Sequence, residues 1–297
     1  PNTLRNYRDR YKHNIQPVIG RIKLTDVKPM HCKKVFIEMD ADYSGSTIHQ
    51  AYITMGTMLK AAEMNDLISK HPMDGVRFTK PVRAANDIKF LTREEQRIFL
   101  ETARRSHDYN QYALILETGL RTGELIGPTW DAVDFEKRTL TVNKTLEFRH
   151  GTKSWRAGPP KTPNSCRTIP LTDTAYGILR EVWDSREERK SSPVLEQTLE
   201  YMDRRSGSMA KLVMRDLVFI NWRTGEPAKN SSYDTHLYKL CDEAEIGRFC
   251  MHALRHTYAT QAIESGMQPK VLQKLLGHGN IKTTMDRHVH VTTESLD

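Results

Sequence analysis

One stretch near residue 80 most constrains what this chain can fold into. Residues 76–87 contain few large apolar side chains, and Pro81 both breaks a helix and disfavours the helical conformation at Lys80. A chain of 297 residues is long enough to bury two modest cores. The sequence therefore predicts two domains, residues 1–75 and 91–297, joined by an extended basic linker at 76–90 that carries Lys80 and Arg83.

The first predicted domain is helical and basic. Each helix begins after a residue that can cap it, and no strand pattern is present; the predicted helices are Thr3–Ile15, Pro29–Met39 and Thr47–Asn65. Residues 1–90 hold 15 Lys and Arg against 9 Asp and Glu, whereas the remainder holds 30 against 28. The formal charge of +8 favours a polyanionic partner, although charge alone does not decide this, since many basic proteins never contact nucleic acid.

The second predicted domain combines helices with a small antiparallel sheet. Thr92 and Glu95 match a capping box that begins a helix running to Arg105. Arg138–Phe148 alternates in polarity and Cys166–Leu171 repeats the signal, which predicts a β-hairpin with a long loop. The other predicted elements are helices at Tyr109–Thr118, Asp173–Lys190, Tyr233–Ala244, His252–Ser265, Lys270–Leu276 and Ile281–His288, and a strand at Leu217–Asn221. The predicted fold class is mainly α with a small antiparallel sheet (α+β).

Several classes of protein are disfavoured. The four cysteines lack CxxC spacing, which argues against a zinc knuckle or a disulfide framework and suits a reducing cytosol. No window approaches the length of an apolar membrane span, and no secretion leader opens the sequence. Because the sequence starts at Pro1 rather than Met, we expect it to be part of a longer or processed chain.

Three short motifs carry the chemical argument. Arg121 lies between two glycines, and Glu124 three residues later could hold its guanidinium bidentately. His252 and Arg255 share one helical face at spacing i, i+3 and can point at the same anion. Lys161 lies in a Pro-rich loop before the second strand. Each motif is weak alone, because a buried Arg–Glu pair, a chance HxxR or a solvated loop lysine is the ordinary explanation.

Taken together and in order, these motifs resemble the tyrosine recombinases, the integrase family that cuts and rejoins DNA through a 3′-phosphotyrosyl link. The resemblance spans about Thr92 to Val291. The matching phrases, in chain order, are Gly119 to Leu125, Trp130 to Phe135, Lys161 to Leu171, His252 to Arg255, and Leu276-Gly277-His278. The ending from Thr283 to Val291 looks most like the integrases of conjugative transposons. The basic front is similar to the core-binding domain of that family, which implies a two-domain clamp around duplex DNA.

The resemblance also assigns roles. Two guanidiniums, Arg121 and Arg255, are suited to bind the charge that builds on an attacked phosphodiester. Lys161 would protonate the departing 5′ oxygen, and His252 and His278 would donate to the phosphate or assist proton transfer. Glu124 would support the arginine. No metal or other cofactor is implied. The implied partners are double-stranded DNA, further copies of the chain in a dimer-to-tetramer synapse, and accessory excision or bending proteins in a bacterial cytoplasm.

The position of the nucleophile departs from the family pattern. His288 stands ten residues after His278, where the family has its tyrosine, and no Tyr follows Tyr258. An imidazole would form a labile phosphoramidate, so we expect strand cleavage to be lost. Tyr258 is more consistent with a core aromatic than with a substitute nucleophile, and a metal site at His278, His288 and His290 is a weaker alternative.

Two other functions remain open at the level of sequence. The fold could serve as a non-catalytic DNA-binding regulator, although keeping Arg121, Lys161, His252, Arg255 and His278 is unexpected for a protein that only binds. A type IB topoisomerase shares the chemistry, but it too would need a tyrosine nucleophile and lacks the transposon-like ending.

Overall fold

A computed structural model describes residues 2–78, 89–160, 162–186, 197–202, 209–214, 216–221 and 225–281. The chain divides into two compact units, Pro1–Ala84 and Ala85–Asp297. Each unit is described by itself below. None of the described helices is long and apolar enough to span a membrane.

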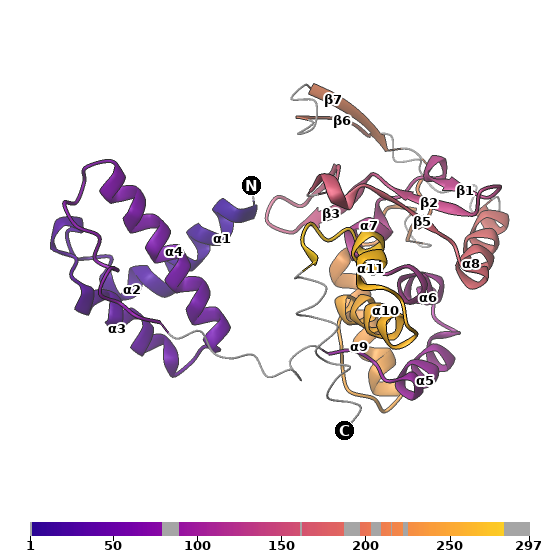
Figure 1. The fold of residues 1–297 in the computed structure, drawn as a ribbon, viewed down its shortest axis with the longest axis horizontal. Coiled ribbons are helices and arrows are strands. Elements are labelled where there is room, and N and C mark those ends of the chain that lie inside the picture. The colour runs from indigo at the N-terminus through magenta and orange to yellow at the C-terminus, as the bar shows by residue number, and fades with distance from the viewer. Residues whose placement is uncertain are drawn as a thin grey trace. The chain divides into compact units, whose positions relative to one another are not determined.

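The first unit is a helical bundle around its own apolar core (Figure 1). Its elements are α1 (Asn2–Arg10), a π-helical turn (Tyr11–Ile15), α2 (Gln16–Ile19), α3 (Pro29–Asp40) and α4 (Gly45–Met64). The predicted helices are confirmed to within two residues, except that the first continues to Ile19. Ser44 caps α4 by accepting a hydrogen bond from the Thr47 amide, and Pro29 occupies the first turn of α3. Buried side chains from three helices, including Ile15, Phe36 and Met55, form the core.

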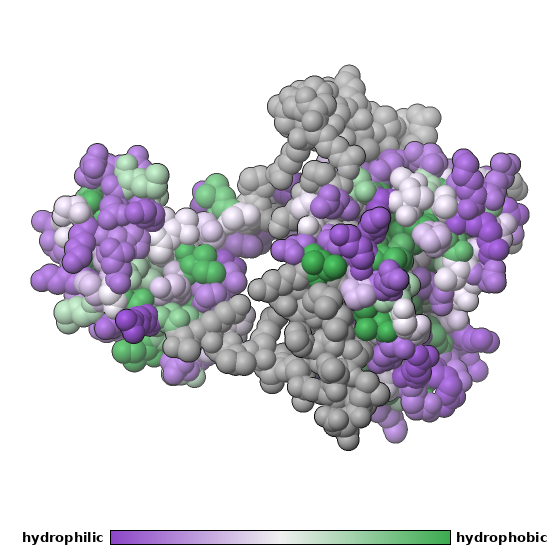
Figure 2. Space-filling model, viewed as in Figure 1, coloured by the Kyte–Doolittle hydropathy of each residue, from purple (hydrophilic) through white to green (hydrophobic). Residues whose placement is uncertain are grey.

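The charged residues of the first unit lie on its surface. Figure 2 shows hydrophilic residues over much of its visible face, with apolar residues scattered between them. Most of its described ion pairs lie on its surface one helical turn apart, such as Arg5–Asp9 on α1 and Lys60–Glu63 on α4, whereas His71, which lies 3.6 Å from Asp74, is largely buried. Such pairs add little stability, so this unit depends on its apolar core.

The second unit contains seven helices among its described residues. They are α5 (Arg93–Ala103), α6 (Tyr109–Thr118), α7 (Thr122–Ile126), α8 (Asp173–Asp184), α9 (Asn230–Glu243), α10 (Met251–Glu264) and α11 (Pro269–Leu276). The predicted capping box is present, since Thr92 and Glu95 each accept the other's backbone amide. Helix α6 has the predicted bounds and ends at Gly119, which adopts the left-handed φ of 63° that favours glycine.

Three small antiparallel sheets accompany these helices. The strands are β1 (Val133–Asp134), β2 (Thr139–Val142), β3 (Thr145–Arg149), β4 (Ser154–Gly158), β5 (Arg167–Pro170), β6 (Gln197–Met202) and β7 (Met209–Met214). The pairing is β1-β2-β5 in one sheet, β3-β4 in a second and β6-β7 in a third. In the first sheet Leu140 pairs with Ile169, and both side chains are buried.

The strand pattern differs from the prediction in three ways. The predicted strand Arg138–Phe148 divides at Lys144, whose buried ammonium donates to Asp131, so that β2 pairs with β5 while β3 pairs with β4. The predicted strand Leu217–Asn221 is wrong, because it forms only a single bridge, between Leu217 and Thr129. Strands β1, β4, β6 and β7 were not predicted from the sequence.

Most helices and strands of the second unit contribute to one core, in which α6 is buried on almost all sides, and side chains of α10 and α11 form a separate smaller cluster. The start of the unit is fixed to α10, since the Leu91 amide donates to Thr257 Oγ1 at 2.9 Å. Helix α6 packs against α10 and α8. Helix α7 lies close on β3, because a Cβ at Gly127 would come within 2.9 Å of the Leu146 nitrogen. With α7 in this position, Glu124 in its first turn lies near Arg167 of β5 and Arg255 of α10.

Candidate active site

Glu124 lies at the centre of the site. Arg121 is the amino-terminal cap of α7, and Glu124 is three residues later in the first turn. The Glu124 carboxylate accepts the Arg121 backbone amide at 3.1 Å and Arg121 Nη1 at 2.5 Å. The Glu124 side chain is 2% exposed, whereas that of Arg121 is 36% exposed. Glu124 therefore holds Arg121 from the protein side while the guanidinium keeps access to solvent.

A second arginine, on β5, binds the same carboxylate. Arg167 Nη2 donates to Glu124 Oε2 at 2.9 Å, and the Arg167 side chain is 6% exposed. Its Nη1 donates to the Ser165 carbonyl at 3.0 Å and its Nε to the Leu275 carbonyl. The bidentate contact with Arg121 that the spacing of Glu124 allows is not formed, since the Glu124 oxygens are divided between the side chains of Arg121 and Arg167.

Arg255 is the third arginine of the cluster and is buried on α10. Its Nη1 donates to the Gly119 carbonyl at 2.6 Å and its Nη2 to the Leu276 carbonyl at 2.7 Å, with Glu124 at 3.8 Å. Burial, and then the nearby charge of Arg121, lower the pKa of Arg255 to about 9, so it remains a cation at neutral pH.

His278 completes the cluster from the turn after α11. Its Nε2 lies 3.1 Å from Arg255 Nη2. Because a guanidinium only donates, Nε2 must accept this hydrogen bond, and the ring proton of the neutral histidine is then on Nδ1. The turn begins at Gly277, with a left-handed φ of 65°, and the His278 amide donates to the Gln273 carbonyl at 3.1 Å.

The electrostatics of the cluster favour an anion. Burial alone would raise the pKa of the Glu124 carboxyl, but the hydrogen bond from Arg167 and the charges of the arginines outweigh it, so the pKa is lowered. Within the cluster that the structure describes, three guanidiniums therefore face one carboxylate. An excess of positive charge in a partly dehydrated site suits a phosphate whose negative charge increases during reaction.

The other predicted site residues are either exposed, as His252 is, or lie outside the described residues. His252 precedes Arg255 by three residues on α10 and is exposed, with its ring edge-on to His256 at 4.6 Å between centroids. Whether it meets the same anion as Arg255 stays a prediction. The predicted positions Lys161, His288, Lys80 and Arg83 lie outside the described residues. The alternative metal site includes His288 and His290, which also lie outside them; the described residues contain no group of three or more potential metal-binding His, Cys, Asp or Glu side chains.

Sequence analysis missed Arg167 as a member of the site. The sequence did contain a signal. Arg167 and Ile169 are two residues apart on β5, so their side chains lie on the same face of the strand, and Ile169 is buried. An arginine at a core-facing strand position needs a buried partner. The sequence offers no indication that this partner is Glu124, 43 residues earlier.

Tyr258 is half-buried and packs in the cluster between α10 and α11. A Cβ at Gly119 would come within 2.5 Å of its ring, so the ring fills the space beside the left-handed glycine. Burial raises the pKa of Tyr258, which disfavours the phenolate that a nucleophile needs. These contacts support the interpretation of Tyr258 as a packing residue.

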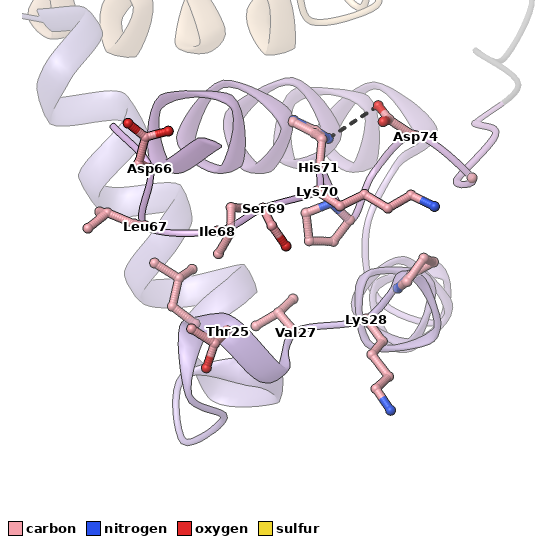
Figure 3. Close-up of a pocket in the computed structure, with 14 residues that line it drawn as sticks. Thr25, Val27, Lys28, Asp66, Leu67, Ile68, Ser69, Lys70, His71 and Asp74 are labelled. Carbon is pink, nitrogen blue, oxygen red and sulfur yellow. Dashed lines mark ion pairs between the residues drawn. The ribbon is translucent and has the colours of Figure 1, made fainter. Parts of the chain in front are cut away.

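A pocket in the first unit has a different character. It lies between the segment before α3 and the loop after α4, and apolar residues such as Val27 and Ile68 line it together with Lys28 and Lys70 (Figure 3). His71 at its edge accepts the Met73 amide and lies 3.2 Å from the Gly56 carbonyl, so both ring nitrogens have backbone partners. The pocket contains none of the predicted site residues.

The fold and the arginine cluster agree with the resemblance to the tyrosine recombinases. Residues 89–295 match the model described as the phage integrase family, and residues 1–39 match the amino-terminal SAM-like domain of phage integrases. The chain belongs to the phage integrase family.

Relatives in this family include proteins of mobile elements. The chain is 27% identical over 291 residues to the transposase of transposon Tn916 from Enterococcus faecalis, covering 93% of this chain and 66% of the transposase. It is 26% identical to a tyrosine recombinase XerC-like protein of Caldanaerobacter subterraneus, covering 98% of this chain and 74% of that protein.

Solved structures confirm the fold. The integrase of transposon Tn1549, in complex with transposon right end DNA, aligns with a TM-score of 0.79 at 23% identity over 100% of this chain and 91% of that chain. A lambda integrase dimer bound to a core site aligns with a TM-score of 0.67 at 16% identity, over 96% of this chain and 88% of that chain. The predicted fold class, mainly α with small antiparallel sheets in the tyrosine-recombinase arrangement, is confirmed.

Proposed function

We propose that the chain binds duplex DNA at the ends of a mobile element and activates a phosphodiester for strand exchange, and that strand cleavage is blocked at His288. The observation that carries the proposal is the cluster in which Glu124 holds Arg121 and Arg167 while Arg255 binds His278. The Tn916 transposase and the DNA-bound Tn1549 integrase support a transposon end as the substrate class.

The proposed chemistry follows from charge and proton balance. In strand cleavage a nucleophile forms a bond to phosphorus while the bond from phosphorus to the 5′ oxygen breaks. Negative charge builds on the non-bridging oxygens, and Arg121 and Arg255 stabilise it. The 5′ oxygen takes a proton, for which we assign Lys161 as the donor. His252 and His278 donate to the phosphate or assist removal of the nucleophile's proton.

The nucleophile decides how far this chemistry proceeds. A tyrosine hydroxyl would give a stable aryl phosphodiester, whereas the imidazole of His288 attacks through nitrogen and gives a labile phosphoramidate. The chain is therefore proposed to bind and assemble as a homo-oligomer on DNA, from dimer to tetramer, and to stop before strand cleavage. Accessory excision or bending proteins and a bacterial cytoplasm belong to the same proposal.

A covalent-adduct assay tests the proposal. The chain and its His288→Tyr variant are incubated with a nicked suicide duplex of transposon ends, and adducts are separated on a denaturing gel. We expect an adduct at a 3′ phosphate only in the His288→Tyr variant. Arg121→Lys in that background should nearly abolish it, because Arg121 is accessible to the phosphate. Arg156→Lys, at an exposed arginine on β4, is the matched control and should leave it unchanged.

The other outcomes of this assay separate the alternatives. An adduct in both forms would identify another nucleophile, Tyr258 or His288 itself. No adduct in either form, despite demonstrated binding to the duplex, would favour a DNA-binding regulator built on the same fold. An adduct that persists unchanged after Arg121→Lys would contradict the site assignment.

Salt dependence tests the DNA interface. Each phosphate contact contributes about −0.9 to the slope of log binding constant against log salt concentration on duplex DNA. We propose that Lys80 and Arg83 each contact a phosphate, so Lys80→Gln with Arg83→Gln should make the slope shallower by about 2. An unchanged slope in the double variant would remove both residues from the interface.

A further inference from the structure

We propose that Arg167 is a positioning residue of the active site, which sets the distance between the Arg121 end of α7 and the turn that carries His278. This inference rests on the proposed function and adds a residue to it. The arginine itself stays beneath the site, where its side chain is 6% exposed.

Arg167 donates hydrogen bonds in three directions. One planar guanidinium donates to the Glu124 carboxylate at 2.9 Å, to the Ser165 carbonyl at 3.0 Å and to the Leu275 carbonyl. These acceptors lie on three segments, namely α7, the loop before β5 and the end of α11. Since the fork is rigid, the three segments cannot shift relative to one another without losing a hydrogen bond.

The turn that carries His278 packs closely against the loop before β5. A Cβ at Gly277 would lie 3.0 Å from Arg167 Nη1 and 3.0 Å from the Ser165 Cα, so the glycine lets the turn approach the guanidinium closely. Ser165 Oγ also donates to the Gly277 carbonyl at 3.2 Å. The turn is thus attached to the loop before β5 immediately before His278.

Arg167 is also connected to the proposed phosphate-binding groups. Arg167 shares Glu124 with Arg121, and its contact at Leu275 is next to Leu276, whose carbonyl accepts from Arg255. Movement of this turn would therefore alter the Arg255–His278 hydrogen bond of 3.1 Å. A misplacement of about 1 Å in such a site costs roughly 100-fold in rate.

The test compares Arg167→Lys with Arg156→Lys. Lysine keeps the positive charge beside Glu124 but cannot donate in three fixed directions from one plane. Arg156 is on β4, half exposed, and its guanidinium pairs with Glu147, so its replacement controls for loss of an arginine elsewhere on the strands. Thermal unfolding of both variants establishes that each one is folded.

The first readout needs neither DNA nor a nucleophile. In protein labelled with 15N-histidine, the ring nitrogens of His278 are assigned by their loss in His278→Gln. The parent should show the Nδ1–H form that the hydrogen bond from Arg255 requires, and Arg167→Lys should change these shifts toward exchange between two forms. Ser165→Ala, which removes only the hydroxyl link to Gly277, should move the same signals less.

The second readout is the rate of adduct formation in the His288→Tyr background. Arg167→Lys should slow it by about 100-fold while the Kd for the duplex stays unchanged. Unchanged His278 signals together with an unchanged adduct rate would overturn the proposal. If the His288→Tyr parent itself forms no adduct, the proposed function fails, and the His278 signals alone still decide whether Arg167 positions the turn.

Discussion

The helical ion pairs of the first unit and the arginine cluster of the second unit arrange charge in opposite ways. In the first unit these pairs lie on the surface, as in Lys60–Glu63, one helical turn apart at 2.6 Å. In the second unit Glu124 is 2% exposed and joins arginines from two other segments, Arg167 at 2.9 Å and Arg255 at 3.8 Å. Oppositely charged groups at similar distances therefore form solvent-exposed pairs in the first unit and a buried cluster around Glu124 in the second.

The difference teaches what each arrangement can do. Exposed charges keep their hydration, so they can attract a polyanion at long range but are not fixed in position. Buried charges have lost hydration before any ligand arrives, so they stabilise developing charge without reorganising. In the proposed function, the first unit contacts a duplex along its backbone and the second acts on one phosphate.

The largest expected effect comes from replacing the buried carboxylate. Glu124→Gln keeps the shape of the side chain but leaves three guanidiniums facing no negative charge, which should cost about 3–5 kcal/mol of stability. Glu63→Gln removes a pair with nearly the same distance on the first unit and should leave unfolding unchanged. Urea unfolding of both variants measures this, and equal midpoints would contradict the comparison.

Glycine substitutions give the next largest contrast. A Cβ at Gly127 would meet backbone atoms of Thr145 and Leu146 at 2.9 Å, so Gly127→Ala must separate α7 from β3 and should cost about 1–3 kcal/mol. A Cβ at Gly56 in α4 meets nothing within 4 Å, and Gly56→Ala should stabilise by about 0.5–1 kcal/mol. Thermal unfolding of the two variants should therefore show midpoint shifts of opposite sign, and shifts of the same sign would show that packing does not distinguish these positions.

Local signals in the sequence predicted much of the fold. The capping box at Thr92 and Glu95 located the start of α5, and Tyr109–Thr118 was predicted with the bounds that α6 has. Such signals act within a few residues, so they survive without knowledge of the rest of the fold. The ordered motifs likewise identified Arg121, Glu124 and Arg255, which the structure brings together.

Contacts between distant segments could not be predicted in the same way. The role of Arg167 depends on acceptors at Glu124 and Leu275, far away in the sequence on both sides. The break between β2 and β3 depends on a contact of Lys144 with Asp131 that alternating polarity does not encode. The alternation of side chains along a strand predicts which face each side chain lies on, whereas these contacts depend on which residue of a distant segment lies against that face.

The smallest expected effect concerns the Lys144–Asp131 pair, which combines a buried cation with an exposed carboxylate. The Lys144 side chain is 7% exposed, and its ammonium donates to both oxygens of Asp131, at 2.8 and 2.9 Å, while the Asp131 side chain is 68% exposed. Burial of the Asp131 carboxyl alone would raise its pKa, but the hydrogen bonds from Lys144 and Thr129 lower it. A lowered pKa stabilises the folded state above the unfolded pKa of about 3.9.

This stabilisation should be lost as the pH falls through the lowered pKa of the folded state. Asp131→Asn should therefore lower the free energy of unfolding most above about pH 5, by less than about 1 kcal/mol because the carboxylate is exposed. Near about pH 2 the Tm of the variant should approach that of the parent. Asp9→Asn, at the exposed Arg5–Asp9 pair of the first unit, is the matched control and should follow the parent at every pH. If the difference in Tm between the parent and Asp131→Asn instead grew toward acid pH, the ionised Asp131 carboxylate would destabilise the fold. The buried Lys144 would then need another counter-charge.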